Sequence, residues 1–225
     1  MIAVIYHLCY IERMEFEELI ELVSDEPAFE TGLLLAGDVD PDYVRVQLSR
    51  WVKSGRLYQL RRGLYALAPP FQKVKPHPFL VANRLARGSY VSLQSALAHY
   101  GLIPEYVPLT TSVGTMRPSH WDTPLGAFSF RHIKADLFWG FGWLDLGGGQ
   151  HAFVATPEKA LLDLIYLQPG ADAPDYLREL RLQNLERLDL DVLARQEERA
   201  HHPKLQRAVE AVMDLARSEA EYEKL

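Results

Sequence analysis

Apolar positions near the start of the chain recur every three or four residues, which is the spacing of an amphipathic helix. The first run predicts a helix over about residues 14–24, which Pro27 ends. Its shared apolar face consists of Phe16, Leu19, Ile20 and Val23. A second short helix is expected over about residues 28–36, with Gly37 at its end.

A third helix has clear signals at both ends. Asp40 is suited to cap its first turn, Pro41 suits its first position, and the helix should end near Ser54. One face predicts a buried stripe formed by Val44, Leu48, Trp51 and Val52. The other face has the composition of a helix that lies in a DNA major groove, because Arg and Lys contact phosphates or guanine, Gln pairs with adenine and Ser contacts either. That face carries Tyr43, Arg45, Val46, Gln47, Ser49, Arg50 and Lys53.

Two short β-prone runs, residues 57–60 and 64–67, follow the third helix around a tight turn that contains glycine. They predict a hairpin whose tip carries Arg61 and Arg62, which would reach a phosphate or the minor groove. Three helices followed by a hairpin with a basic tip predict a winged helix-turn-helix DNA-binding domain over residues 1–68. A winged helix used only for protein contacts is the alternative.

Prolines divide the chain after this hairpin. Residues 69–78 are expected to form a Pro-rich basic linker whose Lys73 and Lys75 either track the backbone of bound DNA or belong to a solvated spacer. Residues 79–225 are expected to form an α+β domain closed by a helical tail, so the fold class of the whole chain is predicted to be α+β.

The second domain is predicted to mix helices with strands. Its expected elements are helices over about 79–86 and 92–100, strands over about 107–113 and 128–133, a hairpin over about 138–155 tipped by Gly147–Gly149, a helix opened by Thr156 and Pro157, and helical structure from Asp175 to the end. The buried side of the helix after Thr156 should be Leu161, Leu162, Ile165 and Tyr166, and the tail stripe should be Leu205, Val209, Val212, Met213 and Ala216.

Charge is distributed very unevenly along the chain. Residues 43–104 hold ten Lys or Arg and no acid, whereas residues 1–42 hold eleven acids and one base. A net charge of −6 therefore hides a basic block, which concentrates positive potential where a polyanion could bind. The candidate DNA contacts in this block are Tyr43, Arg45, Gln47, Ser49, Arg50, Lys53, Arg56, Arg61, Arg62, Lys73 and Lys75.

Composition argues against several other classes of protein. The single cysteine, Cys9, excludes an intramolecular disulfide and fits a reducing compartment. No apolar run approaches the ~18 residues of a membrane span, and the start lacks the basic region and cleavage site of a signal peptide. A cytoplasmic protein without membrane contact is expected, and translation could begin at Met1 or at Met14, where the helical pattern begins.

Catalytic and metal chemistry are weakly supported. The eight histidines are scattered, so neither a metal site nor a cofactor is expected. Ser95 and His99 lie one helical turn apart, but no third group is placed to orient the histidine. Two sets of residues leave alternatives open: Arg131, His132, Glu158 and Lys159 could form a nuclease-like cluster or an internal ion pair that joins strand to helix, and Phe138, Trp139, Phe141 and Trp143 could bind a partner or pack in the core.

Several blocks of the sequence resemble the AbiEi-like antitoxins of type IV toxin–antitoxin (abortive infection) systems, which are often described as transcriptional regulators of viral (phage) defence. The resemblance covers roughly residues 15–170. In the first domain it rests on residues 50–57 and 60–67, which many winged helices share, and in the second on residues 90–104, 111–113, 128–133 and 156–164, which follow in the same order.

The resemblance implies a DNA-binding antitoxin that is not an enzyme. Its winged helix would repress the operon at repeats in its own promoter, and its second domain would oppose a nucleotidyltransferase-like toxin without a stable complex. A homodimer is compatible with this, because repressors often read two half-sites. Three alternatives stay open: a solitary regulator without a toxin, a protein-interaction module that uses the tail stripe and the aromatic residues, and a DNA-processing enzyme.

Overall fold

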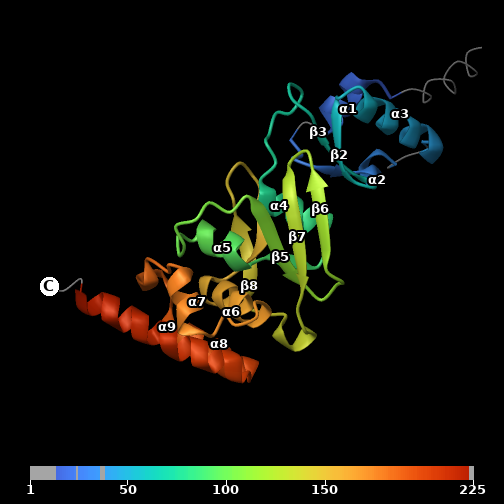
Figure 1. The fold of residues 1–225 in the computed structure, drawn as a ribbon. Coiled ribbons are helices and arrows are strands. Elements are labelled where there is room, and N and C mark those ends of the chain that lie inside the picture. Colours follow the sequence, from blue (N-terminus) through green and yellow to red (C-terminus); the bar gives the residue numbers. More distant parts are fainter. Residues whose placement is uncertain (1–13, 24, 36–38, 223–225) are drawn as a thin grey trace, which may run out of the picture. The chain divides into compact units, whose positions relative to one another are not determined.

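The computed structural model describes residues 14–23, 25–35 and 39–222, and Cys9 and Gly37 lie outside these ranges. The described chain divides into two compact units. The first unit ends at His77, and the second begins at Pro78 and holds nearly all of the remaining residues. Figure 1 shows helices and strands in both units. The chain is therefore of the mixed α+β class, as the sequence predicts.

The first unit contains helices and one small sheet. Its elements are α1 (Phe16–Val23), β1 (Phe29–Glu30), α2 (Thr31–Leu34), α3 (Pro41–Lys53), β2 (Leu57–Arg61) and β3 (Leu64–Leu67). The strands are ordered β1-β3-β2, and both neighbouring pairs are antiparallel. The predicted first helix, third helix and hairpin are confirmed.

The predicted helix over residues 28–36 is wrong in its first part. Phe29 and Glu30 form a strand instead, because they pair with Tyr65 and Leu64 of β3. The rings of Phe29 and Tyr65 also stack, with their centroids 6.0 Å apart. Only the single turn of α2 remains helical in this segment.

Helix α3 begins and ends where its local sequence requires. The Asp40 side chain accepts a hydrogen bond from the backbone N–H of Asp42 (2.9 Å), and Pro41 occupies the first position. Ser54 caps the other end, and Gly55 follows with a φ of +73°, a conformation that glycine adopts at little cost. The helix therefore places its side chains in a fixed register.

The core of the first unit forms where α1 and α3 meet the hairpin. Val44, Leu48 and Trp51 of α3 are buried as predicted, whereas Val52 is half-buried. The Phe16 ring of α1 lies 5.5 Å from the Trp51 ring and 4.9 Å, edge to face, from the Phe71 ring. Because Phe71 packs here, the segment expected to be a linker is attached at its start to this core.

The second unit is built on a sheet ordered β6-β7-β5-β4-β9-β8 (Figure 1). Strands β5 and β7 are parallel, as are β4 and β9, whereas β4 and β5, and β8 and β9, are antiparallel. The strands are β4 (Ser89–Val91), β5 (Leu109–Gly114), β6 (Ser119–Thr123), β7 (Gly126–His132), β8 (Phe141–Asp145) and β9 (His151–Ala155). The sequence predicted β5, β7 and the β8–β9 hairpin but not β4 or β6.

Helices complete the second unit. They are α4 (Pro78–Leu85), α5 (Leu93–His99), η2 (Ala135–Leu137), α6 (Pro157–Leu167), α7 (Pro174–Glu179), η3 (Leu185–Arg187), α8 (Leu190–Ala200) and α9 (Pro203–Tyr222). Helix α6 contacts α5, α8 and α9, so it lies at the centre of the helical part. Within the described ranges, no helix is both long and apolar enough to cross a membrane.

Candidate nucleic-acid interface

Helix α3 exposes a mostly polar stripe along its whole length. The stripe lies opposite the buried residues, and its members are spaced three and four positions apart, which places them on one helical face. Its exposed members are Asp42, Arg45, Val46, Ser49, Arg50 and Lys53, with Tyr43 and Gln47 half-buried at the edge. The structure thus brings six of the eleven predicted DNA contacts together on one surface, called the α3 face below.

Hydrogen bonds organise one side of the α3 face. The Nε2 group of Gln47 donates to the Tyr43 hydroxyl (2.6 Å), and Nη1 of Arg50 donates to Oε1 of Gln47 (3.4 Å). These two contacts fix the orientation of the amide. Bidentate pairing with an adenine edge uses the same amide nitrogen and oxygen.

Arg45 has a partner that it can exchange. Its Nη1 group lies 2.6 Å from Oδ1 of Asp42, and the two side chains are 65% and 83% exposed. An exposed ion pair of this kind contributes little to stability. Arg45 can therefore leave Asp42 for a phosphate at little cost.

The hairpin tip separates the two arginines predicted to lie on it. Arg61 is half-buried, with Nη2 3.5 Å from Oε1 of Glu30 and Nη1 donating to the Arg62 carbonyl (3.1 Å). Arg62 is exposed in the turn beside Gly63, whose carbonyl accepts a hydrogen bond from the backbone N–H of Thr31 (3.0 Å). The tip is thus attached to neighbouring backbone, and Arg62 is the more accessible of its two cations.

The remaining predicted contacts, Arg56, Lys73 and Lys75, belong neither to the α3 face nor to the hairpin tip. The Arg56 guanidinium carbon lies 4.9 Å from the centroid of the Phe16 ring, so this cation also packs against the core of the first unit. Lys73 and Lys75 are exposed in the segment that follows Phe71. The ring contact of Arg56 has no signal in the local sequence, because Phe16 is distant along the chain.

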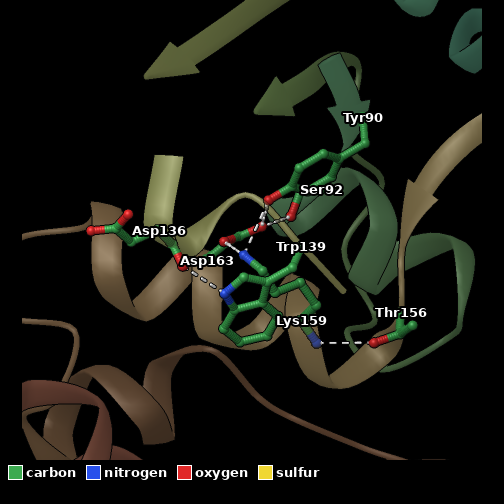
Figure 2. Close-up of polar contacts among 7 residues, drawn as sticks. All are labelled: Tyr90, Ser92, Asp136, Trp139, Thr156, Lys159 and Asp163. Carbon is green, nitrogen blue, oxygen red and sulfur yellow. Dashed lines mark hydrogen bonds and ion pairs between the residues drawn. The ribbon is translucent and has the colours of Figure 1, made fainter. Parts of the chain in front are cut away.

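A second polar arrangement, in the second unit, was not predicted at all. Lys159 and Asp163 of α6 lie buried against Tyr90 of β4 and Ser92, the residue before α5 (Figure 2). Asp163 accepts hydrogen bonds from the Tyr90 hydroxyl (2.9 Å), from the Ser92 hydroxyl (2.8 Å) and from Nζ of Lys159, which also donates to Tyr90 (3.1 Å). The Lys159 ammonium further lies 4.9 Å from the ring centroid of Trp139. These donors and acceptors satisfy one another without solvent.

The environment of this network keeps the Tyr90 hydroxyl protonated. Burial raises the pKa of Tyr90, and the Asp163 carboxylate raises it further. Burial also lowers the pKa of Lys159, an effect that Asp163 opposes. The arrangement therefore joins β4, the start of α5 and α6. It also explains why Ser92, at the N-cap of α5, makes no side-chain bond to its helix: its hydroxyl donates to Asp163.

The spacing of Lys159 and Asp163 in the sequence could have indicated this buried pair. Lys159 and Asp163 are four residues apart in a helix whose other neighbours are mostly apolar, and an opposite-charge pair at that spacing lies on one face. The sequence predicted a buried side for this helix, whereas the structure buries it on nearly all sides, Glu158 included.

The residues considered as a nuclease-like cluster are not assembled. Arg131 donates to the Leu167 carbonyl (3.2 Å), and Glu158 accepts from the backbone N–H of Asp189 (3.0 Å). His132 instead contacts the Met116 carbonyl (3.2 Å), while Lys159 belongs to the buried network. The alternative of an ion pair between strand and helix is also wrong, because Arg131 bonds to a carbonyl oxygen of α6 and not to a carboxylate.

The other side chains considered for chemistry have structural partners. Ser95 donates to the Leu109 carbonyl (3.0 Å) and accepts from the backbone N–H of Thr111 (2.8 Å), which joins α5 to β5. The His99 ring packs 5.4 Å from the Phe79 ring, and burial lowers the pKa of His99. In the part of the chain that the structure describes, no three His, Cys, Asp or Glu residues are grouped as metal ligands.

Comparison with known proteins gives a family match in the first unit and structural matches for the fold. The family model described as "Transcriptional regulator, AbiEi antitoxin" matches residues 40–68, which span α3 and the β2–β3 hairpin. This agrees, for that part of the chain, with the resemblance seen in the sequence. No curated protein matches the chain significantly.

The fold has a counterpart among solved structures. The crystal structure of the RV2827C protein from Mycobacterium tuberculosis matches with a TM-score of 0.52, covering 89% of this chain and 78% of that one. The two sequences are 17% identical, so the likeness concerns the fold alone.

Proposed function

From the match of residues 40–68 we propose that the chain is a DNA-binding transcriptional repressor of the antitoxin type. Helix α3 would enter the major groove, and Arg62 on the hairpin would reach a phosphate or the minor groove. The proposal includes repression of the chain's own promoter. It also includes opposition to a nucleotidyltransferase-like toxin, through a functional effect and not a stable complex.

The α3 face is the observation that carries this proposal. It combines Arg45, Arg50 and Lys53 with the oriented amide of Gln47 on one exposed side of a helix whose opposite side is core. Such a surface offers phosphate contacts for affinity and a polar group for reading a base. Val46 lies within this face and is 48% exposed, so its apolar side chain could contact a thymine methyl group.

The element order supports a winged helix-turn-helix as the fold of the first unit. Helix α3 is followed directly by the β2–β3 hairpin, which the third strand β1 extends into a sheet. The hydrogen bond from Thr31 to Gly63 and the contact of Arg61 with Glu30 hold the hairpin tip beside α2. In this arrangement α3 and the β2–β3 hairpin belong to one compact unit.

A homodimer that reads two half-sites fits this proposal. A regulator without a toxin would use the same DNA contacts. The described residues that suggested the DNA-processing alternative have separate partners and do not meet in one cluster.

The test is a fluorescence-anisotropy titration of the full chain against its own upstream promoter duplex and a scrambled duplex of equal length. Each titration is repeated at several salt concentrations, because released counterions report the number of phosphate contacts. Preference for the promoter together with a steep salt dependence supports the repressor. Equal, weak binding to both duplexes would reject it in favour of the interaction module.

A further inference from the structure

The hydroxyl of Tyr43 lies at the edge of the α3 face, against the side chain that is expected to read a base. Its oxygen lies 2.6 Å from Nε2 of Gln47, one helical turn further along α3. At the other end of the same amide, Oε1 of Gln47 accepts from Nη1 of Arg50 at 3.4 Å. Tyr43, Gln47 and Arg50 therefore form one chain of hydrogen bonds along the helix.

The direction of each hydrogen bond in this chain follows from the chemistry of the three groups. A guanidinium has donors only, so Arg50 must face the oxygen of the Gln47 amide and not its nitrogen. The amide nitrogen is then turned toward Tyr43, whose oxygen accepts. Exchanging the amide oxygen and nitrogen would set two donors against each other at Arg50, so only one orientation of the amide satisfies both neighbours.

Tyr43 holds the amide more firmly than Arg50 does. The Arg50 contact is longer than the usual N–H···O range of about 2.7–3.2 Å, whereas the Tyr43 contact lies at its short end. Tyr43 and Gln47 are also half-buried, whereas Arg50 is exposed and its contact competes with water. The position of the amide therefore depends mainly on the Tyr43 hydroxyl.

The two hydrogen bonds leave the amide with the groups that an adenine edge needs. A glutamine amide has two N–H donors and an oxygen with two lone pairs. Tyr43 occupies one N–H and Arg50 one lone pair, so among the described residues one donor and one lone pair of Gln47 have no partner. In the major groove adenine offers the N7 acceptor beside the N6 donor, whereas guanine offers two acceptors. The remaining groups of Gln47 thus match adenine and not guanine.

We propose that Tyr43 is a positioning residue that makes α3 selective for an adenine at the base pair facing Gln47. The hydroxyl acts through the amide and does not itself contact the base. Arg50 can still bind a phosphate, because a guanidinium has further N–H donors. This inference rests on the proposed function, since it requires α3 to lie in the major groove.

The test is an anisotropy titration of the full chain against promoter duplexes in which each adenine in turn is replaced by 7-deazaadenine. This analogue still pairs with thymine but lacks the N7 acceptor, so it removes one hydrogen bond in the major groove. The proteins are the wild type, Tyr43→Phe, Gln47→Ala and the double variant. The matched control is Tyr176→Phe, which removes a half-buried hydroxyl on α7. Melting temperatures and salt slopes are measured for every variant.

We expect an adenine at which the analogue weakens wild-type binding about two- to tenfold, as for one lost hydrogen bond. Gln47→Ala should bind the analogue and the natural duplex alike, because the donor is gone. Tyr43→Phe should reduce the wild-type difference to less than half, with the salt slope and melting temperature close to those of the wild type. The double variant should behave as Gln47→Ala does, since Tyr43 acts only through Gln47, and Tyr176→Phe should behave as the wild type.

Three outcomes overturn the proposal. The first is a Tyr43→Phe variant that keeps the full wild-type sensitivity to the analogue. The second is a loss of affinity in Tyr43→Phe that appears equally on the scrambled duplex or lowers the salt slope, which would make Tyr43 a backbone contact. The third is a wild type that prefers the promoter but responds to no analogue, and in that case the repressor proposal stands alone. A wild type with no preference for the promoter rejects both proposals.

Discussion

Lys159 and Asp163 lie one turn apart on α6 and form an ion pair although their side chains are only 2% and 1% exposed. Each charge is tolerated because the other, together with Tyr90 and Ser92, satisfies it (Figure 2). Removal of one partner leaves an uncompensated charge in the interior. The pair is therefore a point at which one substitution should affect the stability of the second unit strongly.

We expect Lys159→Met to lower the free energy of unfolding by about 3–5 kcal/mol, as is typical when one member of a buried pair is lost. Urea unfolding followed by circular dichroism at pH 7 measures this. The matched control is Arg178→Met, which breaks the exposed Arg178–Asp175 pair on α7 and should have little effect. Equal losses of unfolding free energy in the two variants would show that burial does not determine the contribution of the Lys159–Asp163 pair.

Gly140 gives a second prediction in the same region. Its φ is +73°, and a Cβ there would lie 2.9 Å from Cγ of Lys159. Gly140→Ala should cost about 1–2 kcal/mol for the left-handed backbone and about 1–3 kcal/mol more for overpacking. Gly170→Ala isolates the first cost, because Gly170 has a φ of +72° and a Cβ added there would meet no neighbouring side chain within 4 Å. Similar losses in thermal stability for both variants would show that the contact with the aliphatic part of Lys159 adds no cost.

The Asp172–Arg207 pair predicts a dependence of stability on pH. Arg207 donates to Oδ2 of Asp172 through Nε (3.1 Å) and Nη2 (2.7 Å), and these hydrogen bonds lower the pKa of Asp172. A lowered pKa means that the stabilisation is present above the unfolded-state value, ~3.9, and is lost as pH falls through the lower folded value. The difference in melting temperature between the wild type and Arg207→Gln should therefore be largest near pH 6 and shrink below about pH 4. A difference that does not change with pH would assign Arg207 a packing role.

Strong local signals made much of the fold predictable. Asp40 and Pro41 located the start of α3, and Thr156 and Pro157 located the start of α6, since capping and proline preferences act within one turn. The short strands were missed for the opposite reason. Strand β4 has three residues, and Tyr90 pairs with Val113, so its identity depends on a distant partner.

The same distinction holds for the candidate interface. The face of α3 was predictable because a helix has a fixed period, and Arg45, Arg50 and Lys53 lie on it. The unequal exposure of Arg61 and Arg62 was not predictable. It depends on Glu30, which lies far from the hairpin in the sequence but beside it in the sheet.

The difference in exposure between Arg61 and Arg62 at the hairpin tip is itself testable. Arg62→Gln should weaken promoter binding and reduce the slope of log affinity against log salt by about one, with little change in melting temperature. Arg61→Gln should lower the melting temperature, because Arg61 is half-buried against Glu30. Thermal unfolding and anisotropy titration of both variants separate the two roles. The reverse pattern would assign the DNA contact to Arg61.

The α3 face gives the most direct prediction about function. Arg50→Gln and Lys53→Gln should each reduce the salt slope of promoter binding by about one, because each would remove one phosphate contact. Arg178→Gln, on the exposed surface of α7, is the matched control and should leave the slope unchanged. Gln47→Ala should differ from all three. If its amide reads a base, it lowers the ratio of promoter to scrambled affinity and leaves the salt slope intact, whereas a uniform loss on both duplexes would show that Gln47 only orients Arg50.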